Sequence, residues 1–323
     1  MNKLSQLAID IYRGSTGNFS NEDSTKALRE EFLKICGTEK IDYKVMRKHK
    51  VEIYEILEEA LTELVGRDME TIFANNAEYR NVAWGDSQMF IIPNPNLFKV
   101  AVVADGVGRA RRQRLDNGTL TVVTKNRIVE IYEEFYRFLA GRIDWVALVN
   151  KVARSYTNQI YTEVYTAIYN GYADLSSTYA KTGAFNESTL KTLIEHVETK
   201  TGTTAAIYGT KNALGMITTA QPSNEEKDAY SKQGYYGAFY STPMRKIFQA
   251  HTTGTDTFAI NNSFVMVLPE GEEKIVKIVD EGDSTIIDMP GGQSADLSQN
   301  YVFIRKSGIA VLSSSVWGQY RFV

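Results

Sequence analysis

One segment constrains the fold more than any other. Residues 143 to 172, IDWVALVNKVARSYTNQIYTEVYTAIYNGY, predict a single long helix. At about 1.5 Å per residue, such a helix is a rod about 40 Å long. One stripe along it is aliphatic apart from Tyr156, and a second is aromatic, formed by Tyr161, Tyr165, Tyr169 and Tyr172. A helix with two apolar stripes must be covered on two sides. This favours a strut inside a larger assembly, although a helix buried in a domain would look the same.

A second feature is the dense positive charge of residues 108 to 118, GRARRQRLDNG, whose arginines are Arg109, Arg111, Arg112 and Arg114. The flanking segments, 88 to 103 and 120 to 129, are rich in β-branched and other apolar residues and predict strands. Together they predict a long hairpin, or two-stranded flap, with a basic tip. A flap of this length is not stable alone, so we expect it to lie against a partner surface.

An acidic surface that could receive these arginines is predicted on an earlier helix. Apolar residues at three- and four-residue steps predict a helix from 47 to 66, with Gly66 as its stop. Its other faces carry Glu52, Glu55, Glu58, Glu59 and Glu63. Such charge runs are usually solvated helix faces, but arginine binds carboxylates bidentately. Because exposed ion pairs contribute only about 0–1 kcal/mol each, the contact would set register more than affinity.

The rest of the chain predicts an N-terminal arm and a mixed C-terminal region. Residues 1 to 46 hold two short helical stretches, each too short to be stable alone, so they would pack on another surface. Residues 186 to 220 predict helix, strand, helix, with Thr210 capping the second helix. From residue 228 onward the pattern is mostly β. A hairpin is predicted across Lys306, Ser307 and Gly308.

The sequence holds no pattern typical of a catalytic, metal or cofactor site. The three histidines, His49, His196 and His251, lie far apart and at no ligand spacing. The segment GTKNA at 209 to 213 lacks the glycine and the Lys-Ser/Thr pair of a phosphate-binding loop. Ser284 follows Gly-Asp, as in some esterases, but it lies between two predicted strands, where a turn is the better interpretation. We therefore expect a protein that is not an enzyme and binds no cofactor.

Composition sets broad limits on partners. The 323 residues carry a formal net charge of only −3, so there is no global basic field for nucleic acid. The arginine segment also lacks the interleaved aromatic residues that stack on bases. The single cysteine, Cys36, leaves no partner for an intramolecular disulfide. We find no signal peptide, and no run approaches the roughly 20 apolar residues of a membrane span.

The order of these parts resembles the major capsid proteins of tailed bacteriophages. The matching stretches are ADGVGRARRQRLDNGTLTVV for the E-loop, DWVALVNKVARSYTNQIYTEVYTAIY for the spine helix, TTAAIYGTKNAL for the A-domain and NYVFIRKSGIAVLSSSVWGQYRF for the closing strands. The resemblance implies an α+β fold. Its parts would be an N-terminal arm (1–46), the P-domain entry helix and strands (47–95), the E-loop hairpin (96–137), the P-domain spine helix (138–185), the A-domain (186–295) and strands returning to the P-domain (296–323).

The resemblance also implies a function. Copies would assemble through pentamers and hexamers into an icosahedral virion shell around double-stranded DNA, in the host bacterial cytoplasm. The implied partners are other copies, a portal protein, decoration proteins and packaged DNA. The arm begins at once, so we expect a separate scaffolding protein. The flap tip holds no lysine, and Lys125 lies well down the return strand. We therefore predict a shell without the covalent crosslinks of some members.

The contacts between copies would come from three places: the four tip arginines, the acidic face of the 47–66 helix and the tyrosine stripes of the spine. Three alternatives stay open. The nearest is an encapsulin-type shell protein, which shares the fold but encloses an enzyme. The others are a hydrolase that uses Ser284 and a nucleic-acid binder with a basic arm.

Overall fold

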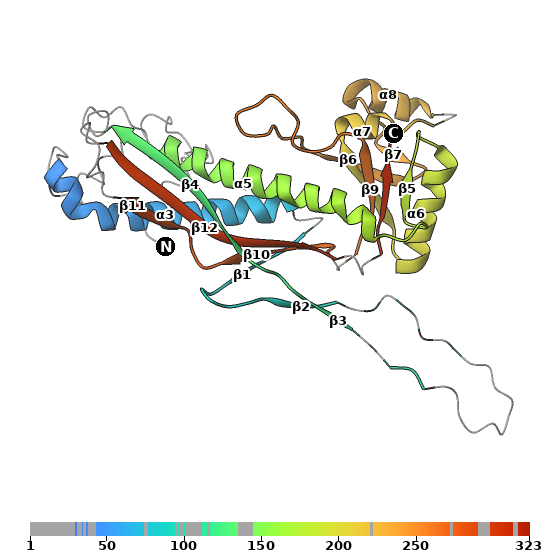
Figure 1. The fold of residues 1–323 in the computed structure, drawn as a ribbon. Helices are drawn as coiled ribbons and strands as arrows, with labels where there is room; N and C mark the ends of the chain where they lie inside the picture. Colours follow the sequence, from blue (N-terminus) through green and yellow to red (C-terminus); the bar gives the residue numbers. More distant parts are fainter. Residues whose placement is uncertain are drawn as a thin grey trace.

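The structure, a computed structural model, describes most of residues 43 to 323. Its gaps are 74–76, most of 93–111, 115–116, 135–144, 220–221, 272–273, 290–297 and 313–315, and before residue 43 it describes only residues 30, 34 and 37. The predicted N-terminal arm therefore lies almost wholly outside the described residues. The fold is α+β, as predicted. Figure 1 shows two long helices beside a body sheet, a compact unit at one end, and a two-stranded ribbon that projects away.

The first long helix, α3 (Tyr43–Phe73), confirms the helix predicted over 47–66 but does not stop at Gly66. The apolar periodicity continues beyond that glycine, since Met69 and Phe73 are both buried. A glycine ends a helix where the chain turns into the left-handed region, and Gly66 has no positive φ. A Cβ added there would meet only the Tyr79 hydroxyl, at 3.6 Å. The predicted stop was wrong because Gly66 lies inside the helix.

The second long helix, α5 (Trp145–Asn170), confirms the predicted rod and is followed by a 3₁₀ turn, η1 (Gly171–Asp174). Its aliphatic stripe is buried through Val152, Ile160, Val164 and Ile168. The helix packs against α3 and against the long strand of the body sheet. These contacts form the largest hydrophobic core of the described residues.

The body sheet is organised around one long strand, β12 (Ser298–Val311). On one edge β12 pairs antiparallel with β4 (Lys125–Glu134). On the other edge it pairs antiparallel first with β11 (Thr285–Met289) and then with β10 (Val276–Glu281). The outer neighbour of β10 is β1 (Ala77–Val82), which pairs with it in parallel. Because β10 and β11 lie end to end along β12, the segment between them bulges without reversing the chain.

The hairpin predicted across Lys306, Ser307 and Gly308 was wrong, because all three residues lie inside the continuous strand β12. Gly308 is needed for a close approach: a Cβ there would lie 2.6 Å from the Val123 carbonyl oxygen and 2.8 Å from Val122 Cγ1. A glycine in a strand often marks such a place. Ser284 does lie between two strands, as predicted, but the segment is a bulge and not a tight turn, because β10 and β11 run in the same direction along β12. Gly282, at the start of this bulge, has a φ of +71°.

The compact unit is built on a second sheet, of order β5-β13-β9-β6-β8-β7. Its strands are β5 (Ala180–Thr182), β6 (Ala205–Thr210), β7 (Ala238–Phe239), β8 (Thr242–Ile247), β9 (Phe264–Pro269) and β13 (Gly318–Arg321). Helices α6 (Glu187–Thr201) and α7 (Lys211–Gly215) confirm the predicted helix, strand, helix. The cap predicted at Thr210 is also confirmed, because its side chain accepts from the Ala213 N–H.

One helix of the compact unit, α8 (Asn224–Gln233), was not predicted. None of its residues is buried, so it shows no apolar stripe. A signal was nevertheless present: Ser223 and Glu226 form a capping box, the S-x-x-E pattern that opens a helix.

The ribbon consists of β2 (Met89–Ile92) and β3 (Gly118–Thr121), paired antiparallel, which confirms the predicted hairpin. The single strand predicted over 120–129 is in fact two, β3 in the ribbon and β4 in the body. The break falls where the chain passes from one sheet to the other. There Val122 is buried in a small cluster with Phe90 and Val279, which joins the ribbon to the body.

Candidate inter-subunit surface

The ribbon has one covered face and one uncovered face, because side chains alternate along its strands. Phe90 and Ile92 are 3% and 8% exposed, whereas Met89 and Ile91 are 56% and 69% exposed. All four are apolar. A surface strand on a self-contained protein would carry polar residues at Met89 and Ile91. The outer face of the ribbon, defined by Met89 and Ile91, is therefore a candidate contact for another molecule.

The basic tip lies beyond this face. Of the four predicted tip residues, Arg112 and Arg114 are exposed, and Arg109 and Arg111 lie outside the described residues. Lys125, predicted to be remote from the tip, is the first residue of β4 in the body. The described part of the tip thus offers arginine, whose planar guanidinium suits carboxylates.

The predicted acidic face of α3 is smaller than the sequence indicated. Glu52 and Glu55 are exposed, and Glu52 accepts a bond from His49 at 3.0 Å. Glu58 instead accepts the backbone N–H of Ile286 at 2.6 Å, and burial raises the pKa of its carboxyl group. The remaining predicted members, Glu59 and Glu63, are half-buried and have interactions of their own. Only part of the predicted face therefore presents carboxylates to solvent.

Three of the four predicted tyrosines of α5 are covered by the chain itself, so for these three the prediction that they bury surface between copies was wrong. Tyr156, Tyr161 and Tyr165 are 2%, 7% and 3% exposed. The Tyr156 hydroxyl donates to the carbonyl of Phe303 at 2.5 Å, and that of Tyr161 donates to the carbonyl of Phe248 at 2.7 Å. Burial raises the pKa of both hydroxyl groups. Tyr169, half-buried, packs edge-on against Phe264 with ring centroids 5.2 Å apart.

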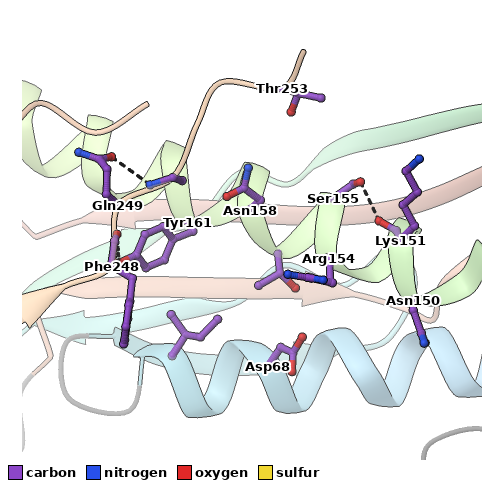
Figure 2. A pocket seen from close by; sticks show the side chains of 13 residues that line it. Asp68, Asn150, Lys151, Arg154, Ser155, Asn158, Tyr161, Phe248, Gln249 and Thr253 are labelled. Atoms are coloured by element: carbon purple, nitrogen blue, oxygen red, sulfur yellow. Dashed lines mark hydrogen bonds between the residues drawn. The ribbon is translucent and has the colours of Figure 1, made fainter. Parts of the chain in front are cut away.

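A groove of about 850 Å³ lies between α3, α5 and the segment after β8. Figure 2 shows Asp68 on α3 below the polar side chains of α5, with Phe248 at the left beside Tyr161 and Thr253 at the top. The groove carries two exposed cations, Lys151 and Arg154. Like charges repel, so this groove is a poor receptor for a ribbon tip made of arginines.

The root of the ribbon is held by one carboxylate, that of Glu281, the last residue of β10. It is 3% exposed. It accepts the Gly85 N–H at 2.9 Å, from the chain entering the ribbon, and the Thr124 hydroxyl, from the chain leaving it. Lys306 Nζ of β12 lies 2.6 Å away. Lys306, with these two hydrogen bonds, lowers the pKa of Glu281 to about 2.

A buried polar network lies beside this carboxylate. Asp280 forms an ion pair with Arg305, and both are almost fully buried. The Tyr79 hydroxyl donates to Asp280 at 2.7 Å, and burial raises the pKa of this tyrosine hydroxyl. Arg305 Nη1 donates to the Ser284 hydroxyl at 2.8 Å. A guanidinium does not accept a proton at accessible pH, so the partner of Ser284 is not a general base.

The histidines stand on separate elements in different surroundings. His196 packs on Tyr179 and His251 on Phe258, with ring centroids 6.4 and 5.4 Å apart. Within the described part of the chain, no cluster of three or more His, Cys, Asp or Glu side chains is arranged to hold a metal ion. The helices there also include none with the length and apolar character of a membrane span.

Reasoning from the sequence missed Glu281. A signal was present: the segment VKIVDE places two acids at the end of a strand that is apolar apart from Lys277, immediately before a glycine. Every residue of β10 is buried. Carboxylates are almost never fully buried unless they are paired, so acids in such a strand indicate partners on neighbouring elements.

Comparison with known proteins places this geometry in context. The model of a family described as "SPbeta prophage-derived putative capsid protein YonB" matches residues 3–319. No curated protein matches the chain.

Solved structures share its fold at low identity. The mature capsid subunit of bacteriophage PhiM1 is 11% identical, with 78% of this chain and 86% of that chain covered and a TM-score of 0.55. The satellite phage P4 procapsid, which includes a size determination protein, is 8% identical over 82% and 90% of the two chains, with a TM-score of 0.51. The head of Helicobacter pylori bacteriophage KHP40 is 10% identical over 77% and 90%, with a TM-score of 0.50. These likenesses confirm the fold implied by the resemblance.

Proposed function

The chain belongs to the YonB family of prophage-derived capsid proteins, and from that membership we propose that its copies assemble through pentamers and hexamers into an icosahedral shell. It is a major capsid protein, a structural component of the virion. The observation that carries the proposed mode of assembly is the uncovered apolar face of the ribbon, at Met89 and Ile91. Repeated contacts of this kind strengthen one another, because each subunit makes several at once.

The parts of the fold are assigned to the named parts of this capsid family. The ribbon β2–β3 is the E-loop. The body sheet with α3 and α5 is the P-domain, and α5 is its spine. The compact unit around the β5-β13-β9-β6-β8-β7 sheet is the A-domain. The boundaries predicted from the sequence differ from this assignment. The range 96–137 leaves out β2 and includes β4 of the body sheet, and the range 186–295 includes β10 and β11 of the body sheet but leaves out β5 and β13.

The proposed contact joins the basic tip of one copy to the two exposed glutamates on α3 of another. Arg112 and Arg114 are exposed at the tip, and Glu52 and Glu55 are exposed on α3. Such opposite charges would fix how the two copies align, although each exposed ion pair stabilises the contact by only about 0–1 kcal/mol. The basic groove beside α5 would repel the same tip, which adds selectivity between the two surfaces.

Further partners are proposed from the family resemblance. The shell would enclose double-stranded DNA and touch it through lysine and arginine without reading sequence. A separate scaffolding protein, a portal protein and decoration proteins would take part in assembly, which would occur in the host bacterial cytoplasm. We assign no catalytic role, because the hydroxyl of Ser284 is engaged by Arg305 in the buried network.

The test is to express the full chain with its neighbouring phage genes and examine the product by electron microscopy. Large, DNA-filled or tail-bearing shells are expected. Small particles filled with an enzyme would favour the encapsulin alternative. Denaturing electrophoresis of the shells should give a single monomer band, and a ladder of multimers would contradict the absence of crosslinks.

The double variant Arg111→Glu, Arg112→Glu tests the tip itself. We expect a folded subunit that forms few closed shells, because loop tips contribute little to fold stability. A matched control is Lys227→Glu, Lys232→Glu on α8, which changes the net charge equally on a helix with no buried residue. Normal shells from the arginine variant would refute the proposed contact.

A further inference from the structure

The ribbon is attached to the body at few points. It consists of two four-residue strands, and its apolar anchorage is the small cluster of Phe90, Val122 and Val279. A two-stranded ribbon on its own is marginal in water. Beyond the root, Lys200 Nζ of α6 donates to Asn96 Oδ1 at 2.7 Å, but this contact is exposed. The direction in which the ribbon leaves the body therefore depends mainly on the contacts at its root.

Glu281 touches the chain on both sides of that root. One carboxylate oxygen accepts the Gly85 N–H, just before β2, and the other accepts the Thr124 hydroxyl, just after β3. The entering and leaving segments are thus tied to one side chain. Glu281 is only 3% exposed. Its negative charge is balanced by Lys306 of the neighbouring strand β12, whose Nζ lies 2.6 Å from the carboxylate. Hydrogen bonds to an ionised acceptor are about twice as strong as neutral ones.

The next residue strengthens the same junction. The Gly282 N–H donates to the Val82 carbonyl at 2.8 Å, and Gly282 has a φ of +71°. A Cβ at this position would lie 2.1 Å from Trp84 Nε1. The indole of Trp84 can lie against the backbone only because residue 282 has no side chain. Residues 281 and 282 together hold the segment from 82 to 85.

We infer that Glu281 is a positioning residue for assembly: it fixes the orientation of the ribbon relative to the body, so that the uncovered face and basic tip point toward a neighbouring copy. This inference rests on the proposed function of the ribbon as an inter-subunit contact. Glu281 would not touch the neighbour. It would act through Gly85 and Thr124, the two ends of the segment that does.

The test compares Glu281→Gln with Glu270→Gln in the full-length chain. Glu270, which follows β9, is the control, because its carboxylate also pairs with a cation, Arg245 of β8, and both residues belong to the compact unit and not to the root of the ribbon. Hydrogen–deuterium exchange is measured on unassembled subunits, and shells are counted by electron microscopy. In Glu281→Gln, amides of 89–92 and 118–121 should exchange about tenfold faster, because a charge-assisted bond is lost. Amides of α5 should be unchanged, and closed shells should be few.

The outcomes separate this inference from the proposed function. Ribbon exchange equal to that of the unmodified chain would overturn the positioning role. Faster ribbon exchange with normal shells would support the positioning role and refute the ribbon as an assembly contact. If Glu281→Gln fails to fold, Thr124→Val removes only the bond on the leaving side. It should then raise exchange in 118–121 more than in 89–92, and equal exchange in both strands would count against the inference.

Discussion

The tyrosine-lined face of α5 and the outer face of the ribbon are both apolar, but only the face of α5 is buried within the subunit. On α5, Tyr161 and Tyr165 are buried against Phe73 of α3, with ring centroids 5.7 and 6.4 Å from it. On the ribbon, Met89 and Ile91 stay more than half exposed. Burying such a side chain is worth about 1.5–3 kcal/mol. The subunit therefore gains stability by burying the tyrosines of α5, while the apolar outer face of the ribbon stays exposed.

The largest effect on the subunit should come from Phe73→Ala, because this side chain joins the two long helices. Removing a buried phenylalanine costs about 3–5 kcal/mol through lost burial and the resulting cavity. The measurement is urea unfolding of the unassembled chain. The adjacent Ile72, 41% exposed on the same helix, is the control, and Ile72→Ala should change stability far less. A loss below about 1 kcal/mol for Phe73→Ala would mean that α3 and α5 are not held together as described.

Sequence patterns predicted elements well where the signal is local. The helical period of α5, the apolar strand β2 and the cap at Thr210 each depend on neighbouring residues, and the structure confirms all three. The patterns failed where the answer depends on distant contacts. Whether a tyrosine stripe is covered by α3 or by a second copy has no local signature. Likewise, Gly308 looks like a turn residue in the sequence, and only the fold shows that a glycine is needed there because Val123 packs against it. The partners of Glu281 come from three separate elements, so only the fold could reveal them.

The next largest effect is expected at Gly308, where the body strand β12 meets the chain leaving the ribbon. Gly308→Ala would place a methyl group 2.6 Å from the Val123 carbonyl oxygen. Forcing an extra carbon into a packed site typically costs about 1–3 kcal/mol. Gly271→Ala is a matched control, since its Cβ would meet nothing within 4 Å. Equal unfolding free energies for the two variants would show that the junction is looser than the contacts of Gly308 indicate.

Acid should weaken the ribbon root as the pH falls from about 4.5 toward 2. The folded pKa of Glu281, about 2, lies below its ordinary value of 4.5. A depressed carboxyl pKa contributes stability that is present above the unfolded value and is lost as the pH falls through the folded value. The charged group facing Glu281 is Lys306, which does not titrate in this range.

The measurement is the difference in unfolding free energy between the unmodified chain and Glu281→Gln from pH 6 to pH 2. This difference should be constant above about pH 4.5 and shrink toward pH 2. Other carboxyl groups with a lowered pKa, such as that of Glu163 beside Arg127, contribute equally to both chains, so their contributions cancel in the difference. A difference that does not change across this window would contradict the charged state assigned to Glu281.

The smallest effect on the subunit, and the most informative for assembly, is expected from Ile91→Thr. Ile91 is 69% exposed, and its threonine replacement keeps the β-branched shape that suits a strand. The unfolding free energy should change by less than about 0.5 kcal/mol. Ile92→Thr is the contrasting variant, because Ile92 is 8% exposed on the opposite face. It should destabilise the ribbon within the subunit. If Ile91→Thr leaves folding intact but reduces shell formation, the outer face serves a second copy. If both processes are unchanged, the exposed face has no role in assembly, and the contrast with α5 would reflect only incomplete burial.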